Sequence, residues 1–298
     1  MAKTALILGA SGSFGGAMAR ELESSGWTVR RWKRGTDMVA AAEGADLIVN
    51  GLNPPNYHNW SELIPKITSD VLAAAKASGA TVFVPGNVYP LGKEPAPWSA
   101  ETRHRPVSRK GAIRAAMESR YRTAAEAGEA KVILLCAGDF LGTDPRLAIN
   151  QVMLRPVAKG RVSTLGAPDV RHAYAYLPDM ARAAVSLLAR DDLPAYLDVP
   201  FPGHSFTTAE LAAIVERLTG RRTVISRFPI WVFAVLSPFW EMARELQEML
   251  YLYEHPHWME ARTLRRWVPD FSETPLETVV ARLLAAKGIQ SSNSTQMG

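Results

Sequence analysis

The stretch TALILGASGSFG, residues 4–15, decides the fold of this chain. Residues 4–8 form a mostly apolar run that predicts a buried strand, and the pattern over residues 14–24 predicts a helix. Between them, Gly9, Gly12 and Gly15 have the spacing GxxGxxG. The first glycine allows a sharp turn, the second lets backbone amides approach a pyrophosphate, and the third allows the helix to pack tightly on the strand.

The start of the predicted helix gives a second reason to expect an anion at this loop. Its first amides and the positive end of its dipole point at any ligand that the loop holds. We therefore predict a dinucleotide site, with an ordinary glycine-rich turn as the alternative. The residues expected to bind the cofactor there are Gly9, Ser11, Gly12, Ser13, Phe14 and Gly15.

The rest of the N-terminal half continues the alternation of strands and helices. Strands are predicted over residues 27–32, 45–49, 81–84 and 131–135, and helices over residues 60–78 and 110–127. Such alternation is typical of βαβ units around a parallel sheet. The predicted fold class is therefore α/β, with a Rossmann-type doubly wound parallel sheet over residues 1–165. A late strand and helix around residues 170–200 return to that domain, and residues 201–298 form a smaller, mainly helical part.

The composition excludes several classes of protein. The chain has 298 residues, of which 47% are hydrophobic and 21% are charged, so it is neither disordered nor fibrous. The single cysteine, Cys136, excludes a disulfide scaffold and a cysteine-based metal cluster, and favours a reducing compartment. The longest apolar stretch, residues 228–240, contains two prolines and is shorter than the about 20 residues that span a membrane. We expect a cytoplasmic protein with no membrane segment.

The net charge of +5 raises the question of nucleic-acid binding. The basic residues are scattered among acidic ones, and aromatic residues do not alternate with them as a stacking platform requires. We therefore expect no nucleic-acid partner, and small anionic ligands account for the surplus equally well.

The end of the second predicted strand distinguishes the two nicotinamide cofactors. A carboxylate there accepts from the ribose hydroxyls of NAD, whereas a cation neutralises the 2′-phosphate of NADP. This chain has Arg30-Arg31-Trp32-Lys33-Arg34 at that place and no acid before Asp37. Lys33 or Arg34 is therefore expected beside the ribose, with Arg31 in reserve, and NADP is predicted while NAD stays possible. The alternative is a solvated basic edge strand.

Three further motifs resemble the short-chain dehydrogenase/reductase superfamily, in the extended or atypical branch that includes nucleotide-sugar epimerases and dehydratases. They are DLIVN at residues 46–50, similar to the family's fourth strand, VFVPGNVY at residues 82–89, and YLPDMA at residues 176–181. The resemblance implies that the C-terminal part covers a small-molecule substrate. It also implies a possible homodimer formed through the helices over residues 60–78 and 110–127. It places Asn50, Gly51, Asn53 and Gly86 beside the cofactor.

The chain departs from this family where the chemistry is expected. The family uses a Tyr-x-x-x-Lys pair on one helix face, but the two positions, aligned on Glu118, fall at Lys110 and Arg114. The resemblance then implies that Lys110 binds the nicotinamide ribose and donates a proton, with Arg114 one turn behind favouring the neutral amine. Alternatively, Lys110 is a solvent-facing residue. A literal match that starts at Tyr89 is broken by Pro90 and Gly92.

Asn87 and Tyr89 complete the predicted catalytic pocket. Asn87 either holds a carbonyl oxygen or caps a turn, which is the commoner use of asparagine. His58 either contacts substrate or is an ordinary helix-start residue. No triad partner is identifiable for His104 or His172, and His255-Pro256-His257 lacks a carboxylate or cysteine at ligand spacing, so no metal site is predicted.

These observations predict an NADP(H)-dependent oxidoreductase or epimerase-type enzyme acting on a small carbonyl or sugar-like substrate. The alternative is a catalytically silent protein that binds NADP(H) as a sensor, which the missing tyrosine favours.

Overall fold

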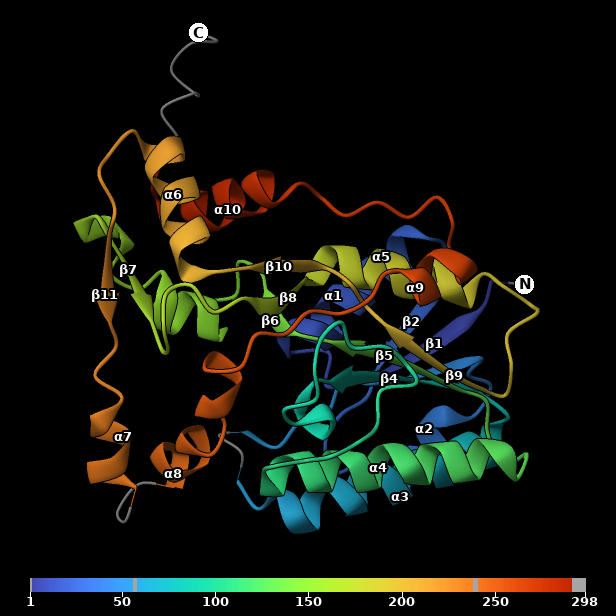
Figure 1. The fold of residues 1–298 in the computed structure, drawn as a ribbon. Helices are drawn as coiled ribbons and strands as arrows, with labels where there is room; N and C mark the ends of the chain where they lie inside the picture. Colours follow the sequence, from blue (N-terminus) through green and yellow to red (C-terminus); the bar gives the residue numbers. More distant parts are fainter. Residues whose placement is uncertain (1, 56–57, 238–240, 291–298) are drawn as a thin grey trace, which may run out of the picture.

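The computed structural model describes residues 2–55, 58–237 and 241–290. Over these residues the centre of the molecule is a six-stranded parallel sheet in the order β2-β1-β3-β4-β5-β9 (Figure 1). Its strands are β1 (Thr4–Leu8), β2 (Thr28–Arg31), β3 (Leu47–Asn50), β4 (Thr81–Asn87), β5 (Val132–Ala137) and β9 (Tyr196–Pro200). All six residues of β5 are buried, as expected for a strand covered on both faces.

Helices cover both faces of this sheet, so the domain has three layers (Figure 1). On one face lie α1 (Ser13–Ser24) and α5 (Leu177–Leu188), and on the other lie α2 (Met38–Ala42), α3 (Trp60–Ser78) and α4 (Arg109–Glu126). The alternate residues of β1 show the division, because Ala5 and Ile7 pack under α1 while Leu6 and Leu8 pack under α2 and α3. The predicted doubly wound α/β fold is confirmed.

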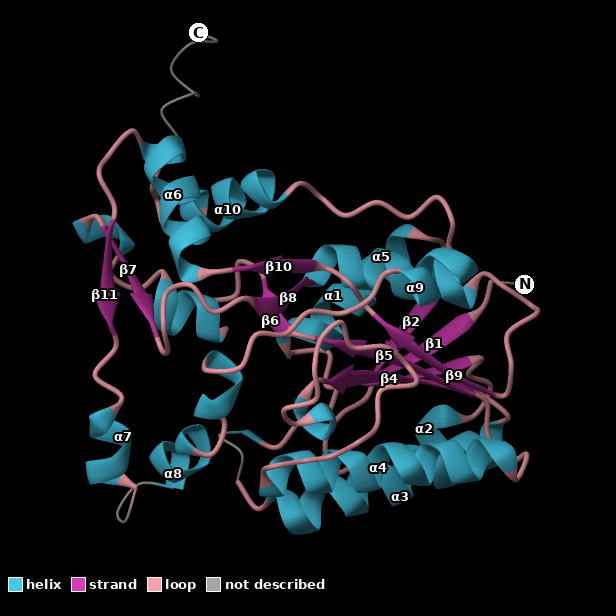
Figure 2. Ribbon diagram, in the orientation of Figure 1, coloured by secondary structure: helices cyan, strands magenta, loops and turns pink. Residues whose placement is uncertain are grey.

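A second group of elements follows β5 and packs beside the carboxyl ends of the strands (Figure 2). Its strands are β6 (Asp139–Leu141), β8 (His172–Tyr176) and β10 (His204–Phe206), which form one sheet, and the pair β7 (Arg161–Thr164) and β11 (Val224–Arg227). Its helices and short turns are η3 (Ile149–Met153), η4 (Val157–Lys159), α6 (Thr208–Thr219), α7 (Trp231–Leu236), α8 (Glu241–Gln247), η5 (Leu250–Tyr253) and α10 (Leu276–Ala285). The turn η2 (Tyr89–Leu91), which precedes β5, packs on the same hydrophobic cluster as η5, whereas α9 (Arg262–Trp267) packs on the core beneath α1 and α5.

The sheet differs from the common strand order 3-2-1-4-5-6 at the edge next to the basic segment of residues 30–34. In the described part of the chain β2 is an edge strand, and the five-residue helix α2 lies between it and β3. β3 then pairs directly with β1, which is the position expected for the family's fourth strand. The basic segment that follows β2 therefore leaves the sheet at an exposed edge.

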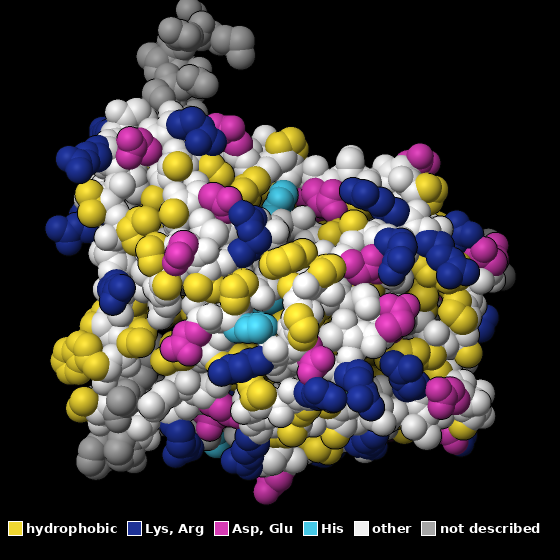
Figure 3. All heavy atoms as spheres, viewed as in Figure 1, with side chains coloured by type: hydrophobic (Ala, Val, Ile, Leu, Met, Phe, Trp, Pro, Cys, Tyr) yellow, Lys and Arg dark blue, Asp and Glu magenta, His cyan; other side chains and the backbone are white. Residues whose placement is uncertain are grey.

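The surface carries no single dominant charge on the face shown in Figure 3, where acidic and basic side chains are interspersed. A patch of hydrophobic side chains lies over α7, in which Trp231 and Val235 are exposed. Further along the chain Met249 and Tyr251 are buried. Among the described helices, none has both the length and the apolar character that crossing a membrane requires.

Candidate functional site

Three glycines hold the β1–α1 turn against the end of β3. Gly9 has φ +76°, and a Cβ there would lie 2.6 Å from the carbonyl oxygen of Gly51. A Cβ on Gly15 would overlap the carbonyl oxygen of Gly9, and one on Gly51 would lie 2.7 Å from that of Leu8. These contacts leave no space for side chains, so the helix starts directly at the carboxyl edge of the sheet, as the glycine spacing predicts.

The first turn of α1 is open to a ligand. Gly12 is its N-cap, with an extended backbone (φ −79°, ψ 162°) and no side chain to satisfy the first N–H groups. The amides of Ser13, Phe14 and Gly15 can therefore donate to an anion. This cradle fits the diphosphate of a dinucleotide. The ring of Phe14 is buried and stacks with Phe83 at 6.3 Å, so only its backbone can serve the ligand.

The loop after β6 reaches the rim of this cradle, which the sequence did not indicate. Ser13 Oγ donates to Asp144 Oδ2 at 2.6 Å, and Arg146 donates to the same carboxylate and to the carbonyl oxygen of Ser11 at 3.0 Å. The hydrogen bonds from Arg146 and Ser13 hold the pKa of Asp144 well below its ordinary value. An ionised carboxylate and a guanidinium thus flank the phosphate loop.

The basic segment after β2 is solvent-exposed at Lys33 and Arg34. Arg31 pairs with Glu23 at 2.6 Å, and Arg30 donates to the carbonyl oxygen of Glu43 at 2.8 Å. Arg31 is exposed as well but already has a carboxylate partner, whereas Lys33 and Arg34 are the residues expected at the ribose. The alternative of a solvated edge strand is correct for the position of β2 itself.

The end of β3 provides structural contacts as well as a wall of the cradle. Asn50 is buried, donates to the hydroxyl of Tyr121 at 3.0 Å and accepts from the amide of Leu52 at 3.3 Å. Burial raises the pKa of Tyr121 to about 12, so its hydroxyl stays protonated. Asn53 is exposed. Of the residues expected beside the cofactor here, Gly51 contacts the glycine loop directly and Asn50 secures the strand end to α4.

At the end of β4, Gly86 lies against β5 and Asn87 caps a turn. A Cβ on Gly86 would lie 3.0 Å from Cα of Cys136. Asn87 Oδ1 accepts from the amide of Tyr89 at 3.1 Å, so the turn-capping interpretation of Asn87 is confirmed. Tyr89 begins η2 and is half-buried. Burial raises the pKa of the Cys136 thiol well above its ordinary value, which makes it a poor nucleophile.

Lys110 lies at the start of α4 and is only 1% exposed, so the solvent-facing alternative is wrong. Its Nζ pairs with Glu248 at 2.5 Å and with Glu245, and its amide donates to Glu248 Oε1 at 3.1 Å. Arg114 instead places its guanidinium over the ring of Trp60, 5.2 Å from the centroid. The described ion-pair partners of Lys110 are therefore the carboxylates of Glu245 and Glu248.

A cavity of about 200 Å³ opens beside Lys110. It is lined from three elements, with His58, Asn59, Trp60 and Ser61 at the start of α3, Arg109, Lys110 and Ile113 on α4, and Arg244 and Glu245 on α8. The structure thus brings His58 and Lys110 to one cavity, as a substrate-contacting role for His58 would require. Glu245 in α8 and Glu248 just after it were missed, because acidic residues so far along the chain from Lys110 give no local signal.

Two histidines without an identifiable partner in the sequence have carboxylate partners in the structure. His172 Nε2 lies 3.1 Å from Asp139 Oδ2, and His104 Nε2 lies 3.5 Å from Glu118. Burial raises the pKa of Glu118 to about 8. His255 Nε2 lies 3.1 Å from the carbonyl oxygen of Glu94, and His257 stacks on Trp98 with ring centroids 4.7 Å apart. His255 and His257, in the loop after η5, therefore both have side chains that contact other parts of the protein.

Comparisons with known proteins support the fold at this point. No family model and no curated protein matches the sequence. Among solved structures, MoeE5 in complex with UDP-glucuronic acid and NAD is 15% identical with a TM-score of 0.76, over 96% of this chain and 99% of that one. UDP-glucuronic acid 4-epimerase from Bacillus cereus, in complex with UDP-glucuronic acid and NAD, is 12% identical with a TM-score of 0.75, over 96% and 99%. UDP-glucose 4-epimerase from Brucella ovis, in complex with NAD, is 14% identical with a TM-score of 0.75, over 97% and 100%. The chain therefore has the fold of these three structures, two of which are 4-epimerases of UDP-sugars, along almost its whole length, as the resemblance implies.

Proposed function

We propose that the chain binds a nicotinamide dinucleotide, NADP(H) in preference to NAD(H), and acts as an oxidoreductase or epimerase-type enzyme on a small carbonyl or sugar-like substrate. The observation that carries the proposal is the contact of Gly9, Gly15 and Gly51 beneath the open end of α1. The similar structures named above hold NAD, and two of them also hold a UDP-sugar, which supports a nucleotide sugar as the substrate class.

The proposed site has two ends, one that binds the cofactor and one that contacts the substrate. The first amides of α1 hold the diphosphate, and Lys33 and Arg34 neutralise a 2′-phosphate. At the other end, Lys110 holds a proton on Nζ beside the cavity that it shares with His58. The carboxylates of Glu245 and Glu248 hold the Lys110 side chain at this cavity, where Nζ can donate to a substrate oxygen. The bound cofactor supplies hydride exchange.

A second candidate is a catalytically silent sensor of NADP(H). It is favoured by the absence of the family's tyrosine and by the two carboxylates that already satisfy Lys110. Incubating the purified protein with NADPH and a panel of aldehydes and enones, and separately with NADP⁺ and nucleotide sugars, separates the two functions. Consumption of NADPH, or conversion of a nucleotide sugar to its epimer, supports the enzyme, whereas tight cofactor binding without either reaction supports the sensor.

The preference for NADPH gives a first prediction. In fluorescence titrations the parent protein should bind NADPH at least tenfold more tightly than NADH, a difference of about 1.4 kcal/mol. Arg34→Ala should remove most of this preference, because it removes the exposed guanidinium that we expect to face the 2′-phosphate. Arg31→Ala is the matched control, since Arg31 pairs with Glu23, and it should change the preference much less. Equal affinities of the parent for the two cofactors would exclude NADP specificity.

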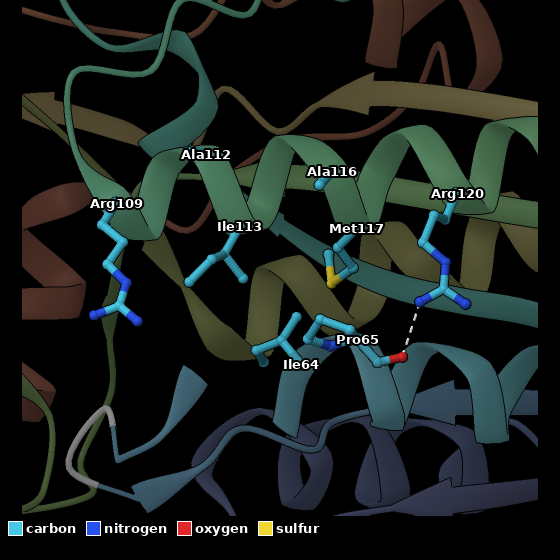
Figure 4. A pocket seen from close by; sticks show the side chains of 8 residues that line it. All are labelled: Ile64, Pro65, Arg109, Ala112, Ile113, Ala116, Met117 and Arg120. Atoms are coloured by element: carbon cyan, nitrogen blue, oxygen red, sulfur yellow. Dashed lines mark hydrogen bonds between the residues drawn. The ribbon is translucent and has the colours of Figure 1, made fainter. Parts of the chain in front are cut away.

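The proposal extends to self-association through α3 and α4. A groove of about 300 Å³ runs between these helices, with Ile64 and Pro65 facing Ile113 and Met117 (Figure 4). Arg120 closes one end by donating to the carbonyl oxygen of Pro65 at 2.9 Å. The occupant that fits is a second copy of the same helix pair, because Ala112 and Ala116 allow close approach of a twofold-related helix.

Light scattering at micromolar concentration should therefore give the mass of a dimer. Ala116→Arg, which puts a long charged side chain into the groove, should give a monomer. Ala209→Arg, at an exposed position of α6, should stay dimeric. A monomeric parent protein would show that the groove has no such partner.

A further inference from the structure

A polar cluster outside the glycine loop surrounds Asp139, the first residue of β6. Its Oδ2 accepts from the hydroxyl of Tyr253 at 2.8 Å and lies 3.1 Å from His172 Nε2. These three side chains come from β6, η5 and β8, so the cluster joins two neighbouring strands of the second sheet to the C-terminal segment. Neither the glycine loop nor Lys110 belongs to it.

The backbone places Asp139 at the edge of the sheet where a substrate is expected. Ala137, the last residue of β5, pairs with Asn87 at the end of β4. A Cβ on Gly138 would overlap the carbonyl oxygen of Ala173, so the chain passes β8 in backbone contact and presents Asp139 two residues beyond the strand end. Tyr253 and Tyr89 pack on the same hydrophobic cluster, which brings Asp139 next to the turn that carries Tyr89.

The back of the cluster is packed, whereas Asp139 is accessible. His172 is 3% exposed, and its ring stacks on Tyr253 at 4.7 Å and meets the edge of His257 at 4.3 Å. The side chain of Asp139 is 26% exposed. Within the described residues both of its hydrogen bonds end on Oδ2, which leaves Oδ1 able to accept from a ligand.

The surroundings keep this carboxyl ionised. Burial raises the pKa of Asp139, but the hydrogen bonds from His172 and Tyr253 outweigh that effect and lower it below its ordinary value. Burial also raises the pKa of Tyr253 well above its ordinary value, so its hydroxyl stays a donor. An ionised carboxylate accepts strong hydrogen bonds from neutral hydroxyls and repels other anions.

We propose that Asp139 contacts the substrate and accepts hydrogen bonds from its hydroxyl groups, with His172 and Tyr253 as positioning residues. This inference rests on the proposed function and narrows its substrate class to sugar-like molecules that are hydroxylated and uncharged at the end facing Asp139. Sugars with a carboxylate at that end are disfavoured, because two anions would meet at a partly buried site.

Calorimetric titration with UDP-glucose and UDP-glucuronic acid, each in the presence of saturating NADPH, tests this inference. The parent protein should bind UDP-glucose more tightly than UDP-glucuronic acid. Asp139→Asn should weaken UDP-glucose binding at least tenfold and should narrow the difference between the two sugars, because the amide carries no charge. Asp192→Asn, at an exposed carboxylate paired with Arg190, is the matched control and should leave both affinities unchanged.

The pH dependence of UDP-glucose binding shows whether Tyr253 positions the carboxylate of Asp139 or only packs beside it. The groups that face Asp139 are His172 and Tyr174 from β8 and Tyr253 and His257 from the C-terminal segment, and Tyr89 from η2 faces Tyr253. Burial, together with His172, lowers the pKa of His257 to about 3, so it is neutral over the range tested.

Binding by the parent should weaken as the pH falls and Asp139 becomes protonated. Tyr253→Phe keeps the ring but removes one hydrogen bond to the carboxylate, so the midpoint of that loss should move to higher pH. Asp139→Asn should not show this loss of UDP-glucose binding at low pH, because its amide carries no ionisable carboxyl. A lower affinity of Tyr253→Phe at every pH, with an unchanged midpoint, would mean that Tyr253 only packs and would overturn its positioning role.

The outcomes distinguish this inference from the proposed function. A parent that binds neither NADPH nor a nucleotide sugar overturns both. A parent that binds NADPH but neither sugar, or that binds UDP-glucose as tightly after Asp139→Asn, overturns the inference alone. If Asp139→Asn does not fold, Tyr253→Phe carries the test through its pH midpoint.

Discussion

A Lys110→Met variant is expected to be less stable than the parent protein by about 2–4 kcal/mol, although methionine fills a similar volume. The side chain of Lys110 is buried, and its ammonium group is the shared partner of Glu245 and Glu248. Removing one partner of a buried ion pair leaves uncompensated charge, which costs about 3–5 kcal/mol, and the partial exposure of the two glutamates reduces that figure. Urea unfolding of the two proteins measures the difference.

A second substitution shows whether the loss comes from the ion pairs. Lys110→Met/Glu248→Gln should recover a large part of the stability, because the remaining carboxylate, that of Glu245, still has Arg244 Nε at 3.5 Å. Arg109→Met is the matched control one residue earlier, where the side chain is exposed, and it should change stability by less than about 0.5 kcal/mol. A Lys110→Met protein as stable as the parent would contradict the stabilising ion pairs that join Lys110 on α4 to Glu245 and Glu248.

The same variant reports on catalysis. If Lys110 donates the proton, turnover should fall at least about a hundredfold in Lys110→Met while NADPH still binds, since a positioned acid contributes about 10²–10⁴-fold. Tyr89→Phe should cost less. Near-normal turnover in Lys110→Met together with abolished turnover in Tyr89→Phe would assign the proton to the tyrosine instead.

The second large effect is expected at the glycine loop. Gly12→Val should weaken the binding of both NADPH and NADH at least tenfold, because its side chain fills the space that the diphosphate needs above the first turn of α1. The fold should tolerate the change, since a Cβ on Gly12 would meet only the carbonyl oxygen of Gly9, at 3.2 Å, and the backbone is extended.

Gly16→Ala is the matched control for Gly12→Val. A Cβ there would also lie 3.2 Å from a carbonyl oxygen, that of Ala10, but within the helix and away from its open end. Its cofactor affinity should stay within about twofold of the parent's, a change of about 0.4 kcal/mol. Equal weakening by both substitutions would indicate general damage to the loop rather than loss of the diphosphate space.

The elements of the parallel sheet were predictable because their signals are local. Apolar runs bounded by turn residues located β1, β3 and β5, and the helix expected over residues 60–78 has the bounds of α3. The glycine spacing also predicted the tight packing of the helix on the strand, which the approach of Gly15 to the carbonyl oxygen of Gly9 shows. Each of these signals depends on neighbours within one turn or one strand.

The contacts that complete the site come from residues far apart in the sequence. Ser13 is 131 residues from Asp144, and Lys110 is 138 residues from Glu248. No periodicity or spacing connects such pairs, so the two carboxylate partners of Lys110 were not predicted. The edge position of β2 was open to prediction only as an alternative, from the basic residues 30–34.

Direct titration of the parent protein with NADPH and NADH tests the central claim, that the glycine loop holds a nicotinamide dinucleotide. The account predicts saturable binding with a preference for NADPH, and at least a tenfold loss of affinity in Gly12→Val while the melting temperature stays close to the parent's. No saturable binding of either cofactor at millimolar concentration, or unchanged binding in Gly12→Val, would contradict it.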